Sequence, residues 1–276
     1  MVHLLATIAN DAEYMPALLH HLREDGPPPA VEGAPEIWGV GYFADDRGLI
    51  VRKPTSILDE RSAYGVAKDL RSRIVLACAR RERVQLDAPP FRFRRWLFGY
   101  AGNVDVLGRL QAQVAPRMPD FVRDVLGDEH GGRFAHAMFL TELHRAGVLE
   151  DPLATSSQLA ATLGRTVESL DRLAPEAGCP ALEAAFVASN GRSLIVACAG
   201  RPLVRREIRG LEGLPDGPVD ETLNDFKRVA EGLKRFRAQV VTLDGSPAAG
   251  VDGQTLPDRS VTIIDGNLEV STEALA

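Results

Sequence analysis

The sequence predicts an α+β fold in which helices pack on antiparallel sheets, and three observations support this. Segments with helical spacing group together along the chain instead of alternating singly with strands, which argues against a Rossmann or barrel plan. Two turn signals, Asp45-Asp46-Arg47 and Asn190-Gly191, each join a pair of apolar runs as in a β-hairpin. Runs such as RIVLACA and SLIVACA are apolar throughout, as expected of strands that are buried on both faces.

The elements follow in order from local pattern. Strands are predicted where short apolar runs end at turn residues, at 1–8, 37–43, 48–53, 73–79, 95–100, 182–189, 193–198, 203–208, 238–242 and 259–264. Helices are predicted from helical spacing at 16–22, 58–70, 104–113, 120–126, 133–146 and 153–173. Pro16 stands in the first turn of the first helix, and Ser156 is the expected N-cap of the last. Residues 225–236 are a charged stretch without an assigned element.

Composition narrows the class of protein. The chain has 276 residues, 45% of them hydrophobic, which is enough for a sizeable core, and we expect one domain over residues 1–276. The net charge of −6 provides no basic surplus for nucleic acid. The three cysteines, Cys78, Cys179 and Cys198, are widely spaced and are expected to be reduced thiols. Because no apolar stretch is long enough for a membrane span and the start lacks a basic signal region, we expect a cytoplasmic protein.

Several segments, in this order, resemble the class II glutamine amidotransferases of the N-terminal nucleophile hydrolase superfamily, in particular the small stand-alone branch with one amidotransferase domain. The similarity covers most of the chain. The segments that carry it are MVHLLATIAN, IWGVGYFADD, IVLACARRE, DAPPF, WLFGYAGNV, GGRFAHAMF, FVASNGRSLIVACAG and RAQVVTLDGSP. The resemblance implies a four-layer α/β/β/α sandwich in which two mainly antiparallel sheets stack face to face.

The resemblance also implies a mechanism. In that family an N-terminal Cys thiolate attacks the side-chain amide of glutamine, its own α-amino group serves as the base, and ammonia leaves. An Asn side chain and a Gly backbone N–H stabilise the oxyanion. An Arg binds the α-carboxylate of glutamine, and an Asp binds its α-ammonium group.

The chemical positions of this pattern are replaced here. The nucleophile falls on Val2, the oxyanion Asn on Ala101, and the Asp that binds the α-ammonium group on Phe134. A neighbouring acidic position falls on His136. The Asn and His of the family's loop before the Pro-Phe pair fall on Asp87 and Pro89.

The positions that match are the candidate ligand-binding residues Arg80, Gly102 and Asn103. Trp38-Gly39 and Pro90-Phe91 match as well. With the nucleophile replaced and the scaffold kept, the resemblance implies a degenerate active site.

Three functional hypotheses remain open. The first is a catalytically inactive protein that binds a protein partner or a small anionic ligand near Arg80, without cofactor or metal. The second is an amidotransferase- or amidohydrolase-type enzyme with altered chemistry, using another nucleophile such as Cys78 or, after internal cleavage, Thr7. The third is an interaction protein whose ancestral pocket is filled by Val2, Pro89 and Phe134.

Two other patterns have simpler explanations. His130, His136, His144 and Glu142 lack the spacing of a compact metal site, so we expect no metal. The stretch FRFRRW (residues 91–96) interleaves aromatic and basic residues, as some single-strand binders do. Its clean alternation instead indicates a strand with outward arginines, which could equally meet an acidic protein partner.

Overall fold

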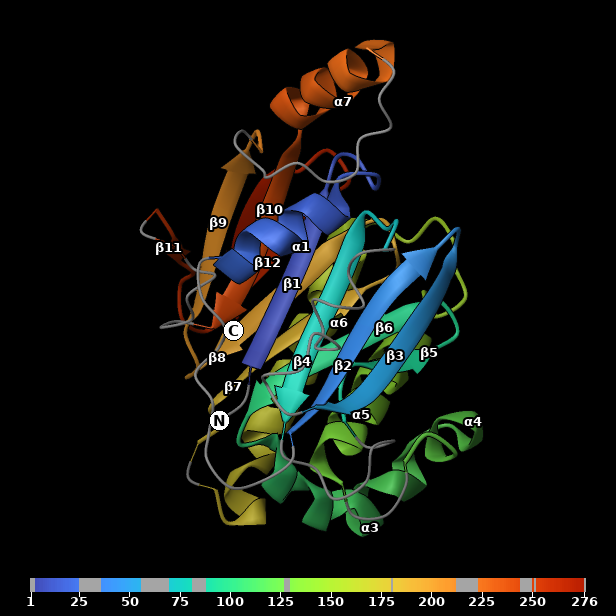
Figure 1. Cartoon of the computed structure of the whole chain (residues 1–276). Coiled ribbons are helices and arrows are strands. Elements are labelled where there is room, and N and C mark those ends of the chain that lie inside the picture. The colour runs from blue at the N-terminus through green and yellow to red at the C-terminus, as the bar shows by residue number, and fades with distance from the viewer. Residues whose placement is uncertain are drawn as a thin grey trace.

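The computed structural model describes residues 3–24, 36–55, 70–80, 88–126, 130–179, 181–211, 223–243, 250 and 252–275. For residues 3, 23, 24, 36, 38, 53–55, 80 and 223–228 it describes the backbone alone. The described part forms two stacked antiparallel sheets with helices on both outer faces (Figure 1). The expected α/β/β/α sandwich is therefore confirmed.

The first sheet has β1 near its centre. Its strand order is β11 (Gln254–Thr255), β9 (Leu203–Arg209), β10 (Arg237–Leu243), β1 (His3–Ala9), β4 (Ile74–Arg80), β2 (Glu36–Ala44) and β3 (Arg47–Thr55). The second sheet has the order β13 (Val270–Ala274), β12 (Ser260–Ile264), β8 (Leu194–Ala199), β7 (Ala184–Ser189), β6 (Trp96–Gly102) and β5 (Phe91–Phe93).

Helices cover the outer face of each sheet. The α-helices are α1 (Met15–Glu24), α3 (Gln111–Val114), α4 (Asp120–Arg123), α5 (Gly131–Arg145), α6 (Ser156–Leu173) and α7 (Leu223–Arg235). The 3-10 helices are η3 (Val104–Leu110), η4 (Ala115–Arg117) and η5 (Pro175–Ala177). Helix α1 packs on the first sheet through Met15, Leu18 and Leu22, whereas α5 and α6 pack on the second. No helix in the described ranges is long and apolar enough to cross a membrane.

The core has three layers: one between the two sheets, one between the second sheet and its helices, and one between the first sheet and α1. On β1, Leu4, Ala6 and Ile8 point into the core between the two sheets. On β6, Leu97 and Ala101 point into that same inter-sheet core. Trp96, Phe98 and Tyr100 alternate with them and point to the helices of the second sheet. Each sheet is thus buried on both faces, which explains why the sequence runs of these strands are apolar throughout.

Local differences from the sequence prediction are small. Helix α6 begins at Ser156 but its N-cap is Thr155, which forms a capping box with Gln158, so the expected cap was one residue late. The charged stretch 225–236 is largely α7. The predicted helix at 58–70 lies outside the described residues except for Leu70.

Candidate functional site

The candidate site lies where β1 begins and where β4 and β6 end. His3 at the start of β1 pairs with Ala79 near the end of β4. Across the sandwich, a Cβ built on Gly99 of β6 would lie 3.0 Å from the Cys78 Sγ and 3.9 Å from Leu4. Leu4 of β1 and Cys78 of β4 are therefore packed against the middle of β6. Val2 lies outside the described residues.

Arg80 is the last residue of β4, where its backbone pairs with Ile37 of β2. Its side chain is outside the described part of the structure. The backbone position alone places Arg80 at the same end of the first sheet as His3, the first described residue of β1. His3, which follows the proposed nucleophile position Val2 in the sequence, and Arg80 therefore lie on neighbouring strands.

Ala101, to which the resemblance assigns the oxyanion position, is fully buried in the inter-sheet core. Its cross-strand partner is Ala185 of β7, and Val187 lies in the same core. A methyl group has no hydrogen-bond donor, and these neighbours are apolar. Ala101 therefore acts as a packing residue.

Gly102 ends β6 with φ +131°, in the region that favours glycine. A Cβ there would also overlap the carbonyl oxygen of Glu183. The backbone of the next residue, Asn103, donates to that same oxygen at 3.0 Å. Glycine is thus required here by the close junction between the end of β6 and the chain that enters β7.

The Asn103 side chain ties this turn to residues 179–183. Its Nδ2 donates to the Cys179 Sγ at 2.9 Å and to the Ala181 carbonyl at 3.1 Å. Its Oδ1 accepts from the Glu183 backbone N–H at 2.9 Å. Both ends of the amide are engaged within the protein, so the visible role of Asn103 is to hold the turn.

Phe134 lies on the opposite side of the second sheet from Ala101. It is fully buried in the core between this sheet and its helices, in the first turns of α5. The first turn of α5 is fixed by Tyr100, whose ring packs against Gly132 and whose hydroxyl lies 3.0 Å from Asp105. Sequence reasoning assigned Ala101 and Phe134 to one pocket, whereas the described structure places their side chains in two different core layers.

His136 is the most unusual polar residue of this region. Its ring stacks between Phe91 and Phe98, at centroid distances of 5.6 Å and 5.5 Å. It is 1% exposed, and among the described residues neither ring nitrogen has a hydrogen-bond partner. Burial, with smaller contributions from the charges of Arg133 and Arg52, lowers the pKa of His136 to about 3. It is therefore neutral at pH 7.

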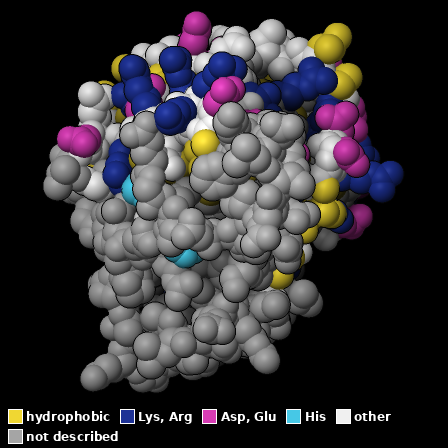
Figure 2. Space-filling view, turned by 45° about the horizontal axis from the view of Figure 1, so that its top comes forward, with side chains coloured by type: hydrophobic (Ala, Val, Ile, Leu, Met, Phe, Trp, Pro, Cys, Tyr) yellow, Lys and Arg dark blue, Asp and Glu magenta, His cyan; other side chains and the backbone are white. Residues whose placement is uncertain are grey.

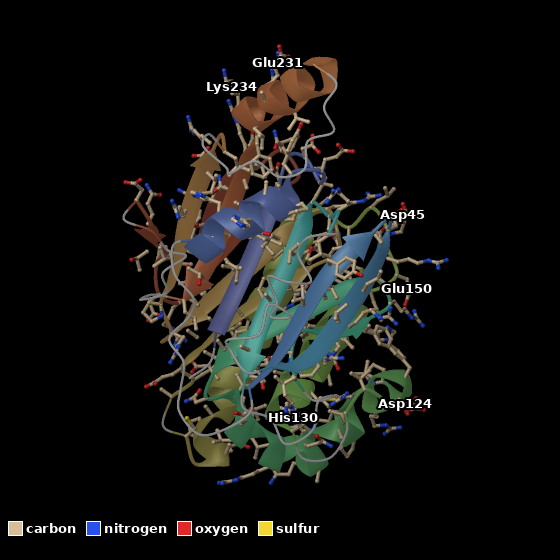
Figure 3. All side chains as sticks on the ribbon, viewed as in Figure 1. Asp45, Asp124, His130, Glu150, Glu231 and Lys234 are labelled. Atoms are coloured by element: carbon tan, nitrogen blue, oxygen red, sulfur yellow. The ribbon has the colours of Figure 1, made fainter. Side chains whose placement is uncertain are left out.

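The α5 residues around this histidine continue the same face of the helix. His130 is the N-cap, and its Nδ1 accepts from the backbone N–H of Arg133 at 3.2 Å. The Arg133 guanidinium lies over the ring of Phe91, 5.6 Å from its centroid. His130 marks the end of the molecule opposite Glu231 and Lys234 of α7 (Figure 3). The sequence analysis considered His130 and His136 only as metal ligands; the aromatic slot depends on the β5–β6 pairing, which the sequence does not reveal.

The loop before β5 is fixed by two residues of the β2–β3 hairpin. Gly39 leaves room for the Pro89 carbonyl, which a Cβ would overlap. Arg52 donates from Nε to the Ala88 carbonyl and from an Nη to the Pro90 carbonyl, each at 2.7 Å. Arg52 was not identified from sequence. An arginine within an otherwise apolar strand segment, LIVR, was the available signal.

The candidate nucleophiles Cys78, Cys198 and Thr7 are all buried in the core of the protein. Cys78 and Cys198 both lie in the inter-sheet core, and burial raises the pKa of Cys198 to about 11. Thr7 is fully buried on the other face of β1, where its hydroxyl contacts the Met15 Sδ at 3.4 Å. All three side chains are buried, whereas an activated nucleophile must be able to reach a substrate.

The two alternative patterns from the sequence also have structural explanations. The described residues contain no group of three or more His, Cys, Asp or Glu side chains that could hold a metal ion. In the FRFRRW stretch, Arg92 donates to the Gly48 carbonyl at 3.0 Å, and Arg94 forms an ion pair with Glu150. Phe91 and Trp96 are buried. The stretch is thus a β-hairpin with engaged arginines.

No family model matches the chain, and a search of curated proteins gives no match. Solved structures do match. A glutamine aminotransferase class-II domain protein from Silicibacter pomeroyi superimposes with a TM-score of 0.62 at 14% identity, covering 99% of both chains. A predicted glutamine amidotransferase from Pseudomonas aeruginosa gives a TM-score of 0.57 at 13% identity, over 99% of this chain and 96% of that one.

A larger enzyme shares the same fold over part of its length. Glutamine phosphoribosylpyrophosphate amidotransferase from B. subtilis gives a TM-score of 0.59 at 14% identity, with 99% of this chain matching 49% of that one. At these identities the likeness is one of fold. The resemblance read from the sequence is confirmed at that level: this chain has the fold of class II glutamine amidotransferase domains.

Proposed function

We propose that this chain is a catalytically inactive protein with the amidotransferase fold, which acts by binding a protein partner or a small anionic ligand. The observation that carries the proposal is the identity and complete burial of Ala101. At the position where the family's mechanism needs an amide donor, this chain has a methyl group that is fully buried in the inter-sheet core. A chain with Val2 at the nucleophile position as well lacks both the attacking group and the oxyanion donor.

The remaining nucleophiles support the same reading. Cys78 and Cys198 are buried in the inter-sheet core, burial raises the pKa of Cys198 to about 11, and Thr7 faces α1. An altered enzyme would need one of these groups to reach a substrate, or a nucleophile from elsewhere. The three described cysteines form no disulfide, which fits a reducing compartment such as the cytoplasm.

The proposed small ligand is an anion bound near Arg80. A carboxylate suits a guanidinium because two parallel hydrogen bonds can form. Free glutamine is a poor candidate, because its α-ammonium group would need a carboxylate: the resemblance assigns that role to the position of Phe134, which is apolar and is buried in the other core layer. An apolar carboxylate fits these replacements better.

Purified protein incubated with glutamine tests the absence of catalysis. We expect no more ammonia or glutamate than with a heat-treated control, and no covalent labelling by an electrophilic glutamine analogue in intact mass spectrometry. Turnover that is abolished by Cys78→Ala would replace this proposal with the altered enzyme. An N-terminus other than Met1 or Val2 in the same mass spectrum would also favour the enzyme.

Ligand binding is tested separately with hexanoate, glutamate and glutamine as probes in thermal unfolding. We expect hexanoate to raise the unfolding midpoint of the wild type most, and Arg80→Gln to remove the increase. Arg172→Gln is the matched control, because Arg172 is an exposed arginine in the last turn of α6. Equal shifts in both variants would rule out the anion site at Arg80.

A further inference from the structure

The far end of the first sheet carries a group of charged side chains that the candidate site does not use. On β9, Arg205, Glu207 and Arg209 alternate and therefore point to one face. Arg237 of β10 lies on that face as well, because it pairs directly with Arg209. We call these four residues the arginine face. It lies at the Ala9 end of β1, opposite the end that holds the candidate site.

This face is the outward continuation of the inter-sheet core. Ile8 of β1 and Val241 of β10 belong to that core. Gln239 of β10, which pairs with Ile8, is only 3% exposed. Farther out, the side chain of Glu207 is 33% exposed and that of Arg209 is 71% exposed. The charged residues therefore begin where the described part of the second sheet stops covering the first.

The charges on this face are only partly neutralised. Arg209 donates to both carboxylate oxygens of Glu207, at 2.8 Å and 3.1 Å. Arg205 donates to the side chains of Gln239 and Gln254, at 2.9 Å and 2.5 Å. The charges of Arg209, Arg205 and Arg237 all lower the pKa of Glu207. Glu207 is thus paired with Arg209, and it is the one carboxylate beside the three arginines of this face.

Arg237 is the unneutralised member. Within the described part of the chain, no hydrogen bond or ion pair engages its guanidinium. It stands directly opposite Arg209, and like charges that face each other across an antiparallel pair are destabilising. A sheet that retains this arrangement gains from an external anion between the two arginines. Lys and Arg side chains, with some Asp and Glu among them, gather at this end of the molecule (Figure 2).

We propose that the arginine face binds an acidic, extended segment of a partner protein. Alternate residues of a strand are roughly 6.6 Å apart, and so are alternate side chains of an extended peptide lying along it. Carboxylates spaced by two or four residues can therefore reach Arg209 and Arg237 at one end and Arg205 at the other. Each contact would be a charge-assisted hydrogen bond, bidentate where the geometry allows.

Glu207 argues against a nucleic acid as the occupant. A polyanion with a charge at every repeat would place a phosphate against this carboxylate, whereas a peptide can place a neutral residue there. The net charge of −6 also disfavours nucleic acid. The occupant that fits this face is therefore a peptide in which acidic residues alternate with neutral ones.

This inference deepens the proposed function, and it rests on that function only in supposing that the chain acts by binding. The arginine face and the region of Arg80 lie at opposite ends of the first sheet, so occupancy of one does not require the other. The glutaminase assay above is run on the same preparations. If the protein hydrolyses glutamine, the proposed absence of catalysis is wrong, whether or not the peptide binds. If it neither hydrolyses glutamine nor binds the peptide, only the proposal for the arginine face is wrong.

The probe is a short fluorescein-labelled peptide of alternating Glu and Thr, and its Gln-and-Thr counterpart is the neutral control. Fluorescence anisotropy at low ionic strength should show binding of the Glu peptide and none of the Gln peptide. Binding should weaken at ~0.5 M salt, because the charges are exposed. A single-stranded oligonucleotide is the competitor, and it should displace the peptide poorly.

Three variants make the test specific. Arg237→Gln should weaken binding roughly two- to fivefold, the scale of one exposed charge pair, while the fold measured by circular dichroism is unchanged. Glu207→Gln should strengthen binding by a similar factor, because it removes the one repulsive carboxylate. Arg172→Gln, the exposed arginine of α6, should have no effect.

The proposal is overturned by any of three results. The Glu and Gln peptides could bind equally, Glu207→Gln could leave the affinity unchanged, or Arg172→Gln could weaken binding as much as Arg237→Gln does. An oligonucleotide that displaces the peptide and is itself weakened by Arg237→Gln would assign the face to a polyanion, and the peptide proposal would be wrong.

Discussion

His136 is stacked on Phe98, with ring centroids 5.5 Å apart and an angle of 22° between the planes. A second aromatic ring, Phe91, lies on it at 5.6 Å, and the two phenylalanines form a cross-strand pair of β5 and β6. The imidazole is thus used as a flat, nearly apolar ring. Its two nitrogens are carried into the core without a partner among the described residues, which is costly.

The pH dependence of stability should report this burial. The folded pKa of about 3 lies below the usual 6.5, so the unfolded chain takes up a proton that the folded chain does not. The free energy of unfolding is therefore highest above pH 6.5, where His136 is neutral in both states, and it decreases as the pH falls from 6.5 toward 3. Urea unfolding should show a loss of about 3 kcal/mol from this residue between pH 7 and pH 4.5.

The His136→Leu variant should lose less stability over the same pH interval and be at least as stable as the wild type at pH 7, because it has no unpaired polar atoms. His144→Leu is the control, since His144 is exposed near the end of the same helix. Parallel pH curves for the wild type and His136→Leu would contradict the buried, neutral state.

Gly39→Ala should be among the most destabilising small substitutions in the chain. The new methyl group would overlap the Pro89 carbonyl, so β2 and the loop before β5 would have to separate. We expect a loss of about 3 kcal/mol or more, or failure to express in soluble form. Gly164→Ala in α6 is the control.

At Gly164 the nearest atom to a new Cβ is the end of the Leu275 side chain, at 3.2 Å, which can shift. Helix propensity favours the alanine there by roughly 1 kcal/mol. Thermal unfolding of the two variants should therefore give opposite or strongly unequal shifts. Similar stabilities would mean that the loop at Pro89 adapts to β2 without cost.

Asn103→Ala should destabilise the turn after β6. The substitution removes the bonds to Cys179, Ala181 and Glu183 and leaves the Glu183 backbone N–H without this acceptor, while the Ala181 carbonyl keeps the Cys179 thiol as a donor. A loss of about 1–3 kcal/mol is expected in chemical denaturation. Asn267→Ala, at an exposed hairpin turn, should change stability by less than about 0.5 kcal/mol. Equal effects at the two sites would remove the structural role given to Asn103.

The three thiols should differ in reactivity in the native protein. Cys78 and Cys198 are buried in the inter-sheet core, and the pKa of Cys198 is raised to about 11, whereas Cys179 is partly exposed. Iodoacetamide at about pH 8 should therefore modify Cys179 first, and all three only after unfolding. Rapid labelling of Cys78 in the native protein, located by peptide mass spectrometry, would instead support the hypothesis of an enzyme with altered chemistry.

Elements whose own residues decide their structure were predictable. The hairpin at Asn190-Gly191 is present between β7 and β8, with Gly191 at φ +89° and the Asn190 Oδ1 accepting from two backbone N–H groups. Strand β13 was missed because all five of its side chains are exposed and it has no apolar alternation. The start of α5 was placed two residues late, because nothing in the local pattern marks His130 as its cap.

The site was predictable in part. The order of the motifs predicted that the start of β1, the end of β4 and the turn at 101–103 lie together; of this, the structure shows His3 beside Ala79 and Gly99 of β6 against Cys78 and Leu4. The separation of Ala101 from Phe134 could not be predicted, because it depends on which face of β6 each helix covers. The same tertiary pairing decides the slot around His136, which no spacing along the chain encodes.

The complete enclosure of Ala101 has an evolutionary consequence. An asparagine at this position would have to bury its carboxamide beside Ala185 and Val187, and the described side chains of that core are apolar. A mutation to asparagine alone would therefore be selected against through lost folding stability. It would become neutral only if polar partners appeared at neighbouring positions with it.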